Sequence, residues 1–170
     1  MSSWQLMKIL PSMATILEQF IDLLYAKVWW YMTPDDEAAS SQAWLARAKG
    51  NLSLAQGGYL IQGIFLEDLC FNTQQAAEKA LKAVCVQYAL DFPKTHSLVS
   101  LMDLLEAADI QIPEQVKEAD ILTQFAVRTR YPGWIEPVTE QEYLEALALA
   151  QAVVNWAVSL ISQLNDNRKS

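Results

Sequence analysis

Apolar residues recur at helical spacing along most of this chain, and this periodicity constrains the fold more than any other feature. They fall near positions i, i+3 and i+4, as on the buried stripe of an amphipathic helix. No stretch alternates between apolar and polar residues as a half-buried strand does. Only 5 glycines and 6 prolines in 170 residues leave few residues for the tight turns of a many-stranded protein. The sequence therefore predicts an all-α protein.

Helix boundaries follow from capping residues and helix breakers. Helices are predicted over the ranges 12–32, 34–56, 67–90, 96–108, 114–129 and 139–164. Thr33 caps the second of these and Pro34 suits its first turn, while Gly57 is expected at its end. Thr139 followed by Glu142 is a capping box for the last helix. We expect an up-and-down bundle of four to five helices with an extra N-terminal helix.

The chain divides into three parts on composition. Residues 1–33 form a Trp-rich helical extension with three of the six tryptophans, residues 34–165 form the bundle, and residues 166–170 form a frayed tail. The extension could pack on the bundle, join subunits or rest on a membrane surface. We favour the first two because it lacks the basic face of a surface-binding helix. Glu18, Asp22 and Lys27 also make it a poor membrane span, so no membrane contact is expected.

Charge and cysteine content exclude several classes of function. The net charge of −8 argues against non-specific nucleic-acid binding over the whole surface. Two cysteines and one histidine exclude a Cys/His zinc cluster within one chain, and we expect no metal and no cofactor. Cys70 and Cys85 are predicted on one helix, roughly 22 Å apart at ~1.5 Å per residue, which is too far for a disulfide. Reduced thiols indicate a cytoplasmic protein.

A polar stripe lies on the predicted helix 67–90. Gln75, Glu78, Lys79 and Lys82 fall within an arc of about 100° at ~100° per residue. One interpretation is a solvated surface, in which the Glu78–Lys82 pair contributes only a few tenths of a kcal/mol. The other is a semi-buried cluster that binds an anion, with the two lysines as donors. Phe71 shares this side of the helix, which indicates that another element covers it.

Basic residues at two other helix ends could complete such a cluster. His96 opens a predicted helix, whose free N–H groups could hold an anion, although Thr95 could equally cap that helix. Arg128, Arg130 and Tyr131 close the helix 114–129, where arginines also satisfy terminal carbonyl groups. If these residues converge, they form one phosphate pocket. The candidate binding residues are Gln75, Glu78, Lys79, Lys82, His96, Arg128, Arg130 and Tyr131.

Three sequence blocks form a recognisable pattern: CF with QQAAEKALKA at 70–83, PKTHSL at 93–98 and RYP at 130–132. In order and spacing they resemble the HEPN family, whose name refers to nucleotide binding in higher eukaryotes and prokaryotes. The resemblance covers roughly residues 37–164 and not the first 33. It implies a cytoplasmic bundle of four or five helices that is commonly dimeric. It also implies a minimal nucleotidyltransferase as a partner, in toxin–antitoxin or defence systems.

Many HEPN proteins are metal-independent ribonucleases that carry an Arg followed four to six residues later by a His. This chain departs from that pattern, because its only histidine has no Arg within the preceding 48 residues. Our leading interpretation is therefore a non-catalytic binding module, a homodimer that binds a nucleotide or phosphate group or partners a nucleotidyltransferase. The alternatives are a degenerate endoribonuclease that cleaves RNA with His96 and Arg130, and a structural protein that oligomerises through residues 1–33.

Overall fold

The computed structural model describes residues 40–128 and 136–167, except the side chains of residues 127 and 128. All secondary structure in this part of the chain is helical, which confirms the predicted all-α class. The predicted helix 12–32 and the cap at Thr33 lie outside the described residues. The helices are α2 (Ser41–Gly58), α3 (Leu66–Gln87), α4 (Leu98–Ala107), α5 (Glu114–Lys117), the 3-10 helix η1 (Glu118–Gln124), α6 (Phe125–Arg128) and α7 (Glu140–Asn167).

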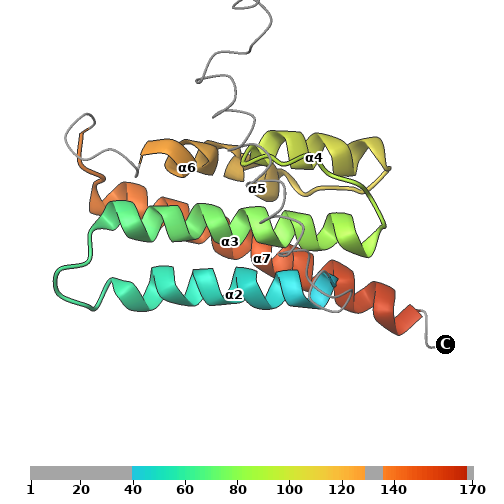
Figure 1. The fold of residues 1–170 in the computed structure, drawn as a ribbon, viewed down its shortest axis with the longest axis horizontal. Coiled ribbons are helices and arrows are strands. Elements are labelled where there is room, and N and C mark those ends of the chain that lie inside the picture. The colour runs from blue at the N-terminus through green and yellow to red at the C-terminus, as the bar shows by residue number, and fades with distance from the viewer. Residues whose placement is uncertain (1–39, 129–135, 168–170) are drawn as a thin grey trace, which may run out of the picture. The chain divides into compact units, whose positions relative to one another are not determined.

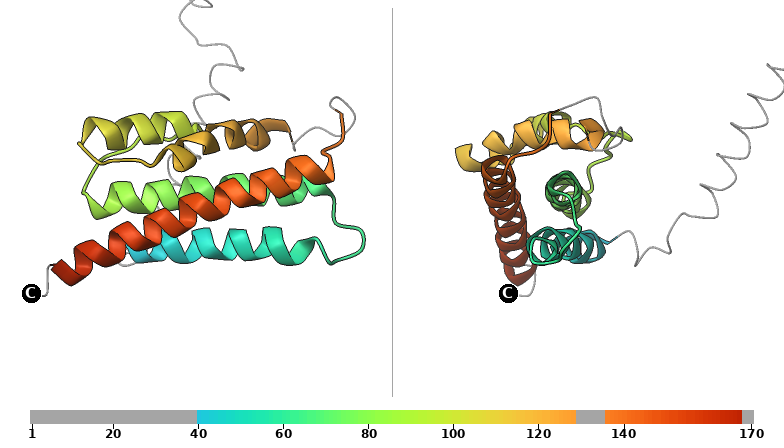
Figure 2. Two further views of the ribbon diagram at one scale, coloured as in Figure 1. Left: turned by 180° about the vertical axis from the view of Figure 1, so that it is seen from behind. Right: turned by 90° about the vertical axis from the view of Figure 1, so that its left-hand side faces the viewer.

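Helix α3 is the centre of the bundle. It runs antiparallel to α2 and contacts α2, α7, α4, η1 and α6. Figure 1 shows α4, α5 and α6 in a row along one side of α3, with α2 on the opposite side. In Figure 2, α7 lies on a third side of α3, and the loop from α3 to α4 lies away from α7. A side chain on α3 therefore faces a different neighbour on each side of the helix.

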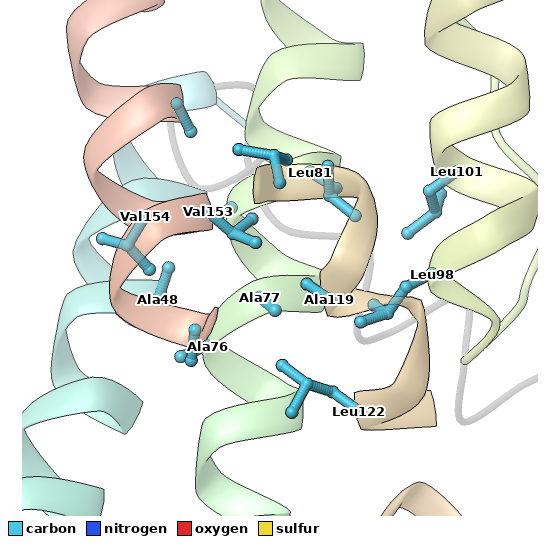
Figure 3. Packing of buried hydrophobic residues seen from close by; sticks show 14 of the residues in the cluster. Ala48, Ala76, Ala77, Leu81, Leu98, Leu101, Ala119, Leu122, Val153 and Val154 are labelled. Atoms are coloured by element: carbon cyan, nitrogen blue, oxygen red, sulfur yellow. The ribbon is translucent and has the colours of Figure 1, made fainter. Parts of the chain in front are cut away.

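Small side chains let the neighbouring helices approach α3 closely. Ala76, Ala77, Ala80 and Ala83 are fully buried along its length. The larger core side chains of α3, α4, η1 and α7 meet in one cluster, as Figure 3 shows. Dispersion contacts and the removal of apolar surface from water stabilise this cluster.

The two cysteines lie buried on α3 and are not joined in a disulfide, as the sequence predicts. Burial raises the pKa of the Cys85 thiol to about 11, so this sulfur stays protonated near neutral pH. A protonated, enclosed sulfur is a poor nucleophile, and Cys85 acts here as a small apolar core residue.

Several predicted helix boundaries differ from the structure. Helix α2 begins at Ser41 rather than Pro34, because the Ser40 hydroxyl accepts a hydrogen bond from the Ala43 N–H at 3.2 Å and caps the helix there. The predicted helix 114–129 is divided into α5, η1 and α6. In a 3-10 helix residues i and i+3 eclipse each other, and Ala119, Leu122 and Phe125, which repeat at that interval, are all buried.

The predicted capping box of the last helix is confirmed. The Glu142 N–H donates to the Thr139 hydroxyl at 3.2 Å, and the Thr139 N–H donates to the Glu142 carboxylate at 2.7 Å. Among the described helices, α7 alone is long and apolar enough to cross a membrane. This criterion counts only length and composition, and a core helix that packs as α7 does against α3 and α2 also meets it.

Candidate functional site

The polar stripe of α3 turns inward instead of facing water. The buried polar side chains of this helix are Thr73, Gln74, Glu78 and Lys82. Glu78 is only 4% exposed and Lys82 only 9%. The interpretation of the stripe as a solvated surface is therefore wrong for these two residues. Buried charges need partners, and the arrangement around Glu78 supplies them.

The Glu78 carboxylate lies at the centre of the cluster. Its Oε1 atom accepts a hydrogen bond from Lys82 Nζ at 2.8 Å. Its Oε2 atom accepts from Gln74 Nε2 at 2.8 Å and lies 3.1 Å from His96 Nδ1. An ionised carboxylate only accepts hydrogen bonds, so His96 carries a proton on Nδ1 in this arrangement. The His96 side chain is 61% exposed, and its Nε2 atom makes no hydrogen bond within residues 40–128 and 136–167.

These partners change the acidity of Glu78. Burial by itself would raise the pKa of Glu78. The hydrogen bonds from Lys82 and Gln74, the charge of Lys82 and the contact with His96 together outweigh burial and lower the pKa below the ordinary 4.5. Glu78 is therefore ionised throughout the neutral range and holds the cations around it in place.

Two aromatic rings cover Lys82. Its Nζ atom lies 5.6 Å from the ring centroid of Trp44 and 5.6 Å from that of Phe92. The rings meet edge to face, with centroids 6.2 Å apart. Trp44 comes from α2 and Phe92 from the loop after α3, so two separate elements cover the stripe. Lys82 therefore contacts the Glu78 carboxylate and both ring faces at once, which fixes the position of Glu78.

Lys79 has a different environment on the side of α3 that faces α2. Its Nζ atom donates to Asn51 Oδ1 at 2.6 Å, and Asn51 in turn donates to Asn72 Oδ1 at 2.7 Å. Burial lowers the pKa of Lys79, as do the charges of Arg47 and Lys82, while Glu78 opposes the shift. Among the described residues, no carboxylate lies within 4.0 Å of this ammonium. Lys79 is thus a half-buried cation beside two like charges.

The structure brings together only part of the predicted set. Glu78 contacts both Lys82 and His96, and the Gln75 amide lies at the edge of the cluster, 3.5 Å from Glu78 Oε2. The side chain of Arg128 and all of Arg130 and Tyr131 lie outside the described residues. Their convergence with α3 remains a prediction.

Sequence reasoning missed three contributors to the site. Gln74 was available from the sequence, since an amide four residues before a glutamate faces it on a helix. The residues around Arg47 and Asn51 in the sequence do not predict that these two belong to the site, because only the packing of α2 on α3 places them beside Lys79. Among residues 40–128 and 136–167, no three His, Cys, Asp or Glu side chains are grouped so that they could hold a metal ion.

The helix after Phe92 also begins later than predicted. Ser97 caps α4, because its hydroxyl accepts the Ser100 N–H at 3.2 Å. Thr95 is not the cap, and its hydroxyl instead accepts the Ser97 N–H at 3.0 Å in a local turn. His96 therefore lies just before the helix. The Gln74 amide also bonds to the His96 carbonyl at 3.3 Å, which ties this segment to α3.

Comparisons with known proteins agree with this fold and with the earlier resemblance. The crystal structure of TT1696 from Thermus thermophilus is 34% identical, with a TM-score of 0.58, covering 70% of this chain and 96% of that one. The crystal structure of ST0689, an archaeal HEPN homologue, is 25% identical, with a TM-score of 0.57, covering 72% and 98%. A search of curated proteins found no match. The profile of the HEPN domain matches residues 41–161, and the chain therefore belongs to the HEPN domain family.

Proposed function

We propose that this HEPN protein is a non-catalytic, dimeric binding module that holds the phosphate group of a nucleotide beside α3. Its family further suggests a minimal nucleotidyltransferase as the partner, in a toxin–antitoxin or defence-type system. The observation that carries the proposal is the environment of Lys79, a half-buried ammonium near two cations. Among the described residues no carboxylate lies within 4.0 Å of its Nζ atom, and the charge of Glu78 acts on it from farther away.

The local charge balance supports an anionic ligand. The whole chain has a net charge of −8, yet Lys82 and Lys79 both lie near the Glu78 carboxylate, and Arg47 lies near Lys79. Lys82 already binds that carboxylate through Nζ, so Glu78 is shared between cations. An ammonium has three donors, and among the described residues Lys79 uses one of them, on Asn51; the other two can bind phosphate oxygens. A bound phosphate would offset the repulsion among the cations.

Lys79→Gln tests this proposal. The glutamine amide can keep the hydrogen bond to Asn51 but removes the charge, so affinity for ATP and for inorganic phosphate is expected to fall by about tenfold, as for the loss of one charged hydrogen bond. Isothermal titration calorimetry at low salt measures both. The matched control is Lys49→Gln, an exposed lysine on α2 for which affinity should stay within about twofold. Equal affinities in the two variants, or no binding by the unmodified protein, would rule out the Lys79 site.

A ribonuclease is the second candidate, and the His96–Glu78 pair favours it. A carboxylate that holds Nδ1 leaves Nε2 as a proton acceptor, which is the arrangement of a general base. The binding module predicts no cleavage of structured or single-stranded RNA above the level of a His96→Ala control. Cleavage by the purified protein that His96→Ala abolishes would instead establish the ribonuclease. Gel analysis of labelled RNA separates the two outcomes.

A further inference from the structure

A shallow groove of about 580 Å³ lies between α7 and the α5–η1 segment. Its lining combines three apolar residues, Ile121, Ala148 and Leu149, with carboxylates of both elements. The loop that carries His96 lies on the side of α3 away from α7 (Figure 2). The groove is therefore separate from the Glu78 cluster, and its role does not depend on phosphate binding there.

We call the apolar lining residues Ile121, Ala148 and Leu149 the floor of the groove. The rest of the bundle leaves this apolar surface partly uncovered. Ile121 is 51% exposed, and Leu144 on the neighbouring turn of α7 is equally exposed. The most apolar 18-residue stretch of α7 is hydrophobic enough to meet the membrane criterion, yet only 33% of it is buried. A helix this apolar is normally covered on most sides. Exposed apolar surface beside a polar rim is typical of a protein interaction site.

The rim of the groove is acidic. We call the charged lining residues of the groove the rim: Glu118 and Asp120 on the η1 side and Glu145 on the α7 side. No lysine or arginine of the described residues belongs to the lining. Lys117 is adjacent in sequence, but its ammonium is paired with Glu106 at 2.5 Å. The hydrogen bond that Lys117 donates to this carboxylate raises the pKa of Lys117, so its positive charge stays beside Glu106. The groove therefore presents uncompensated negative charge around an apolar floor.

We propose that this groove docks an amphipathic helix of a partner protein, whose apolar stripe enters the groove and whose flanking lysines or arginines meet the acidic rim. A volume of about 580 Å³ is enough for a few apolar side chains. Binding of a helix by its apolar face in a groove is a common mode of peptide recognition. The charges on the two sides of the stripe fix its register and exclude helices with acidic flanks.

The acidic rim favours a basic partner helix over three other possible occupants: a second copy of the chain, residues 1–39 and nucleic acid. A second copy of the chain has a net charge of −8 and would set acidic rim against acidic surface. Residues 1–39 carry two lysines against five carboxylates, so they too are repelled by the rim. Nucleic acid is also negatively charged, so the acidic rim repels it. A basic partner helix is the occupant that satisfies both the apolar floor and the acidic rim.

A designed peptide tests the proposal on the full-length protein. The probe is a fluorescent peptide of about 18 residues with leucines at i, i+3, i+4 and i+7 and lysines on both flanks. One matched peptide carries glutamate in place of lysine, and another carries serine in place of leucine. Fluorescence anisotropy measures Kd for each. Both matched peptides are expected to bind about tenfold more weakly than the probe, because one lacks the charge and the other the apolar stripe.

Charge-reversal variants locate the binding to the groove. Glu118→Lys with Glu145→Lys should raise the Kd of the probe by about tenfold. The control Asp91→Lys replaces one exposed carboxylate of the α3–α4 loop by a lysine and should change the Kd of the probe by less than about twofold. Ile121→Ser, which changes no charge, should weaken binding about fivefold. Lys79→Gln should leave it unchanged, which separates this site from the proposed phosphate site.

Three results would overturn the proposal. The first is equal binding of the probe by the unmodified protein and the double variant, provided that thermal unfolding shows both to be folded. The second is equal affinity for the lysine and glutamate peptides, or no binding of the probe. The third is a change in the mass of the protein in sedimentation velocity when the rim is reversed, which would assign the groove to contact between copies of this chain.

Discussion

Lys82→Glu is expected to lower the free energy of unfolding by about 3 to 5 kcal/mol at pH 7, the range for breaking a buried ion pair. Lys82 donates to Glu78 at 2.8 Å in a site where both side chains are buried. The substitution replaces this bond with two carboxylates that cannot both stay ionised at small cost. It also places negative charge against the faces of Trp44 and Phe92, which favour a cation.

The effect of Lys82→Glu should depend on pH in a defined direction. The pKa of Glu78 is lowered by folding, so its contribution is complete above its ordinary value of 4.5 and is lost as the pH falls through the lower folded value. In the variant the repulsion between carboxylates raises their pKa values, and protonation relieves it at low pH. The difference between the two proteins should therefore be large at pH 7 and shrink below about pH 4.5.

Urea unfolding followed by circular dichroism at pH 7 and at pH 4 measures the loss of stability in Lys82→Glu and its dependence on pH. The matched control is Lys49→Glu, the same change on an exposed residue of α2, for which we expect a shift within about 0.5 kcal/mol. If Lys82→Glu and Lys49→Glu have the same stability at pH 7, the Glu78–Lys82 pair does not hold this part of α3 together.

Leu81→Ala should destabilise the protein by about 3 kcal/mol, within the range of 2 to 5 for a fully buried leucine. Leu81 has no exposed surface and lies in the core that α3 forms with α4, η1 and α7 (Figure 3). The loss combines the transfer free energy of the deleted atoms with the cost of the cavity they leave. Because α3 is contacted from several directions, its neighbours cannot all move in to fill this cavity.

Leu54→Ala is the matched control for Leu81→Ala. Leu54 is 61% exposed on α2, so the same deletion removes little buried surface and should change stability by about 0.5 kcal/mol or less. Chemical unfolding of both variants gives the comparison directly. A loss below about 1 kcal/mol for Leu81→Ala would mean that the centre of the bundle is much more adaptable than its burial indicates.

Membership of the HEPN family fixes the fold of this chain, but activity depends on its sites. The strict Arg and His spacing of the family's ribonucleases is absent from the sequence. In its place, α3 has a buried carboxylate that arranges Lys82 and His96, with a half-buried Lys79 beside it. We propose that this arrangement holds an anion and that the acidic groove beside α7 binds a basic partner at a separate surface.

The sequence predicted local structure correctly where a few neighbouring residues decide it. The capping box of Thr139 and Glu142 was predicted correctly, because both partners lie within one turn. The 3-10 helix η1 was missed because its period of three becomes favourable only when neighbouring elements cover that face. The start of α2 was misplaced because two capping sequences are available, at Thr33 and at Ser40, and the local pattern does not rank them.

The sequence by itself determined that the chain is helical, that it belongs with HEPN proteins, and that glutamate and lysines share one side of α3. Helical period and capping are properties of contiguous residues, so they can be read along the chain. Only the tertiary structure decided that Trp44 and Phe92 cover Lys82, that His96 meets Glu78, and that Arg47 lies near Lys79. These contacts join residues far apart in the chain, and burial at such contacts is what turns an ordinary helix pair into a structured charge cluster.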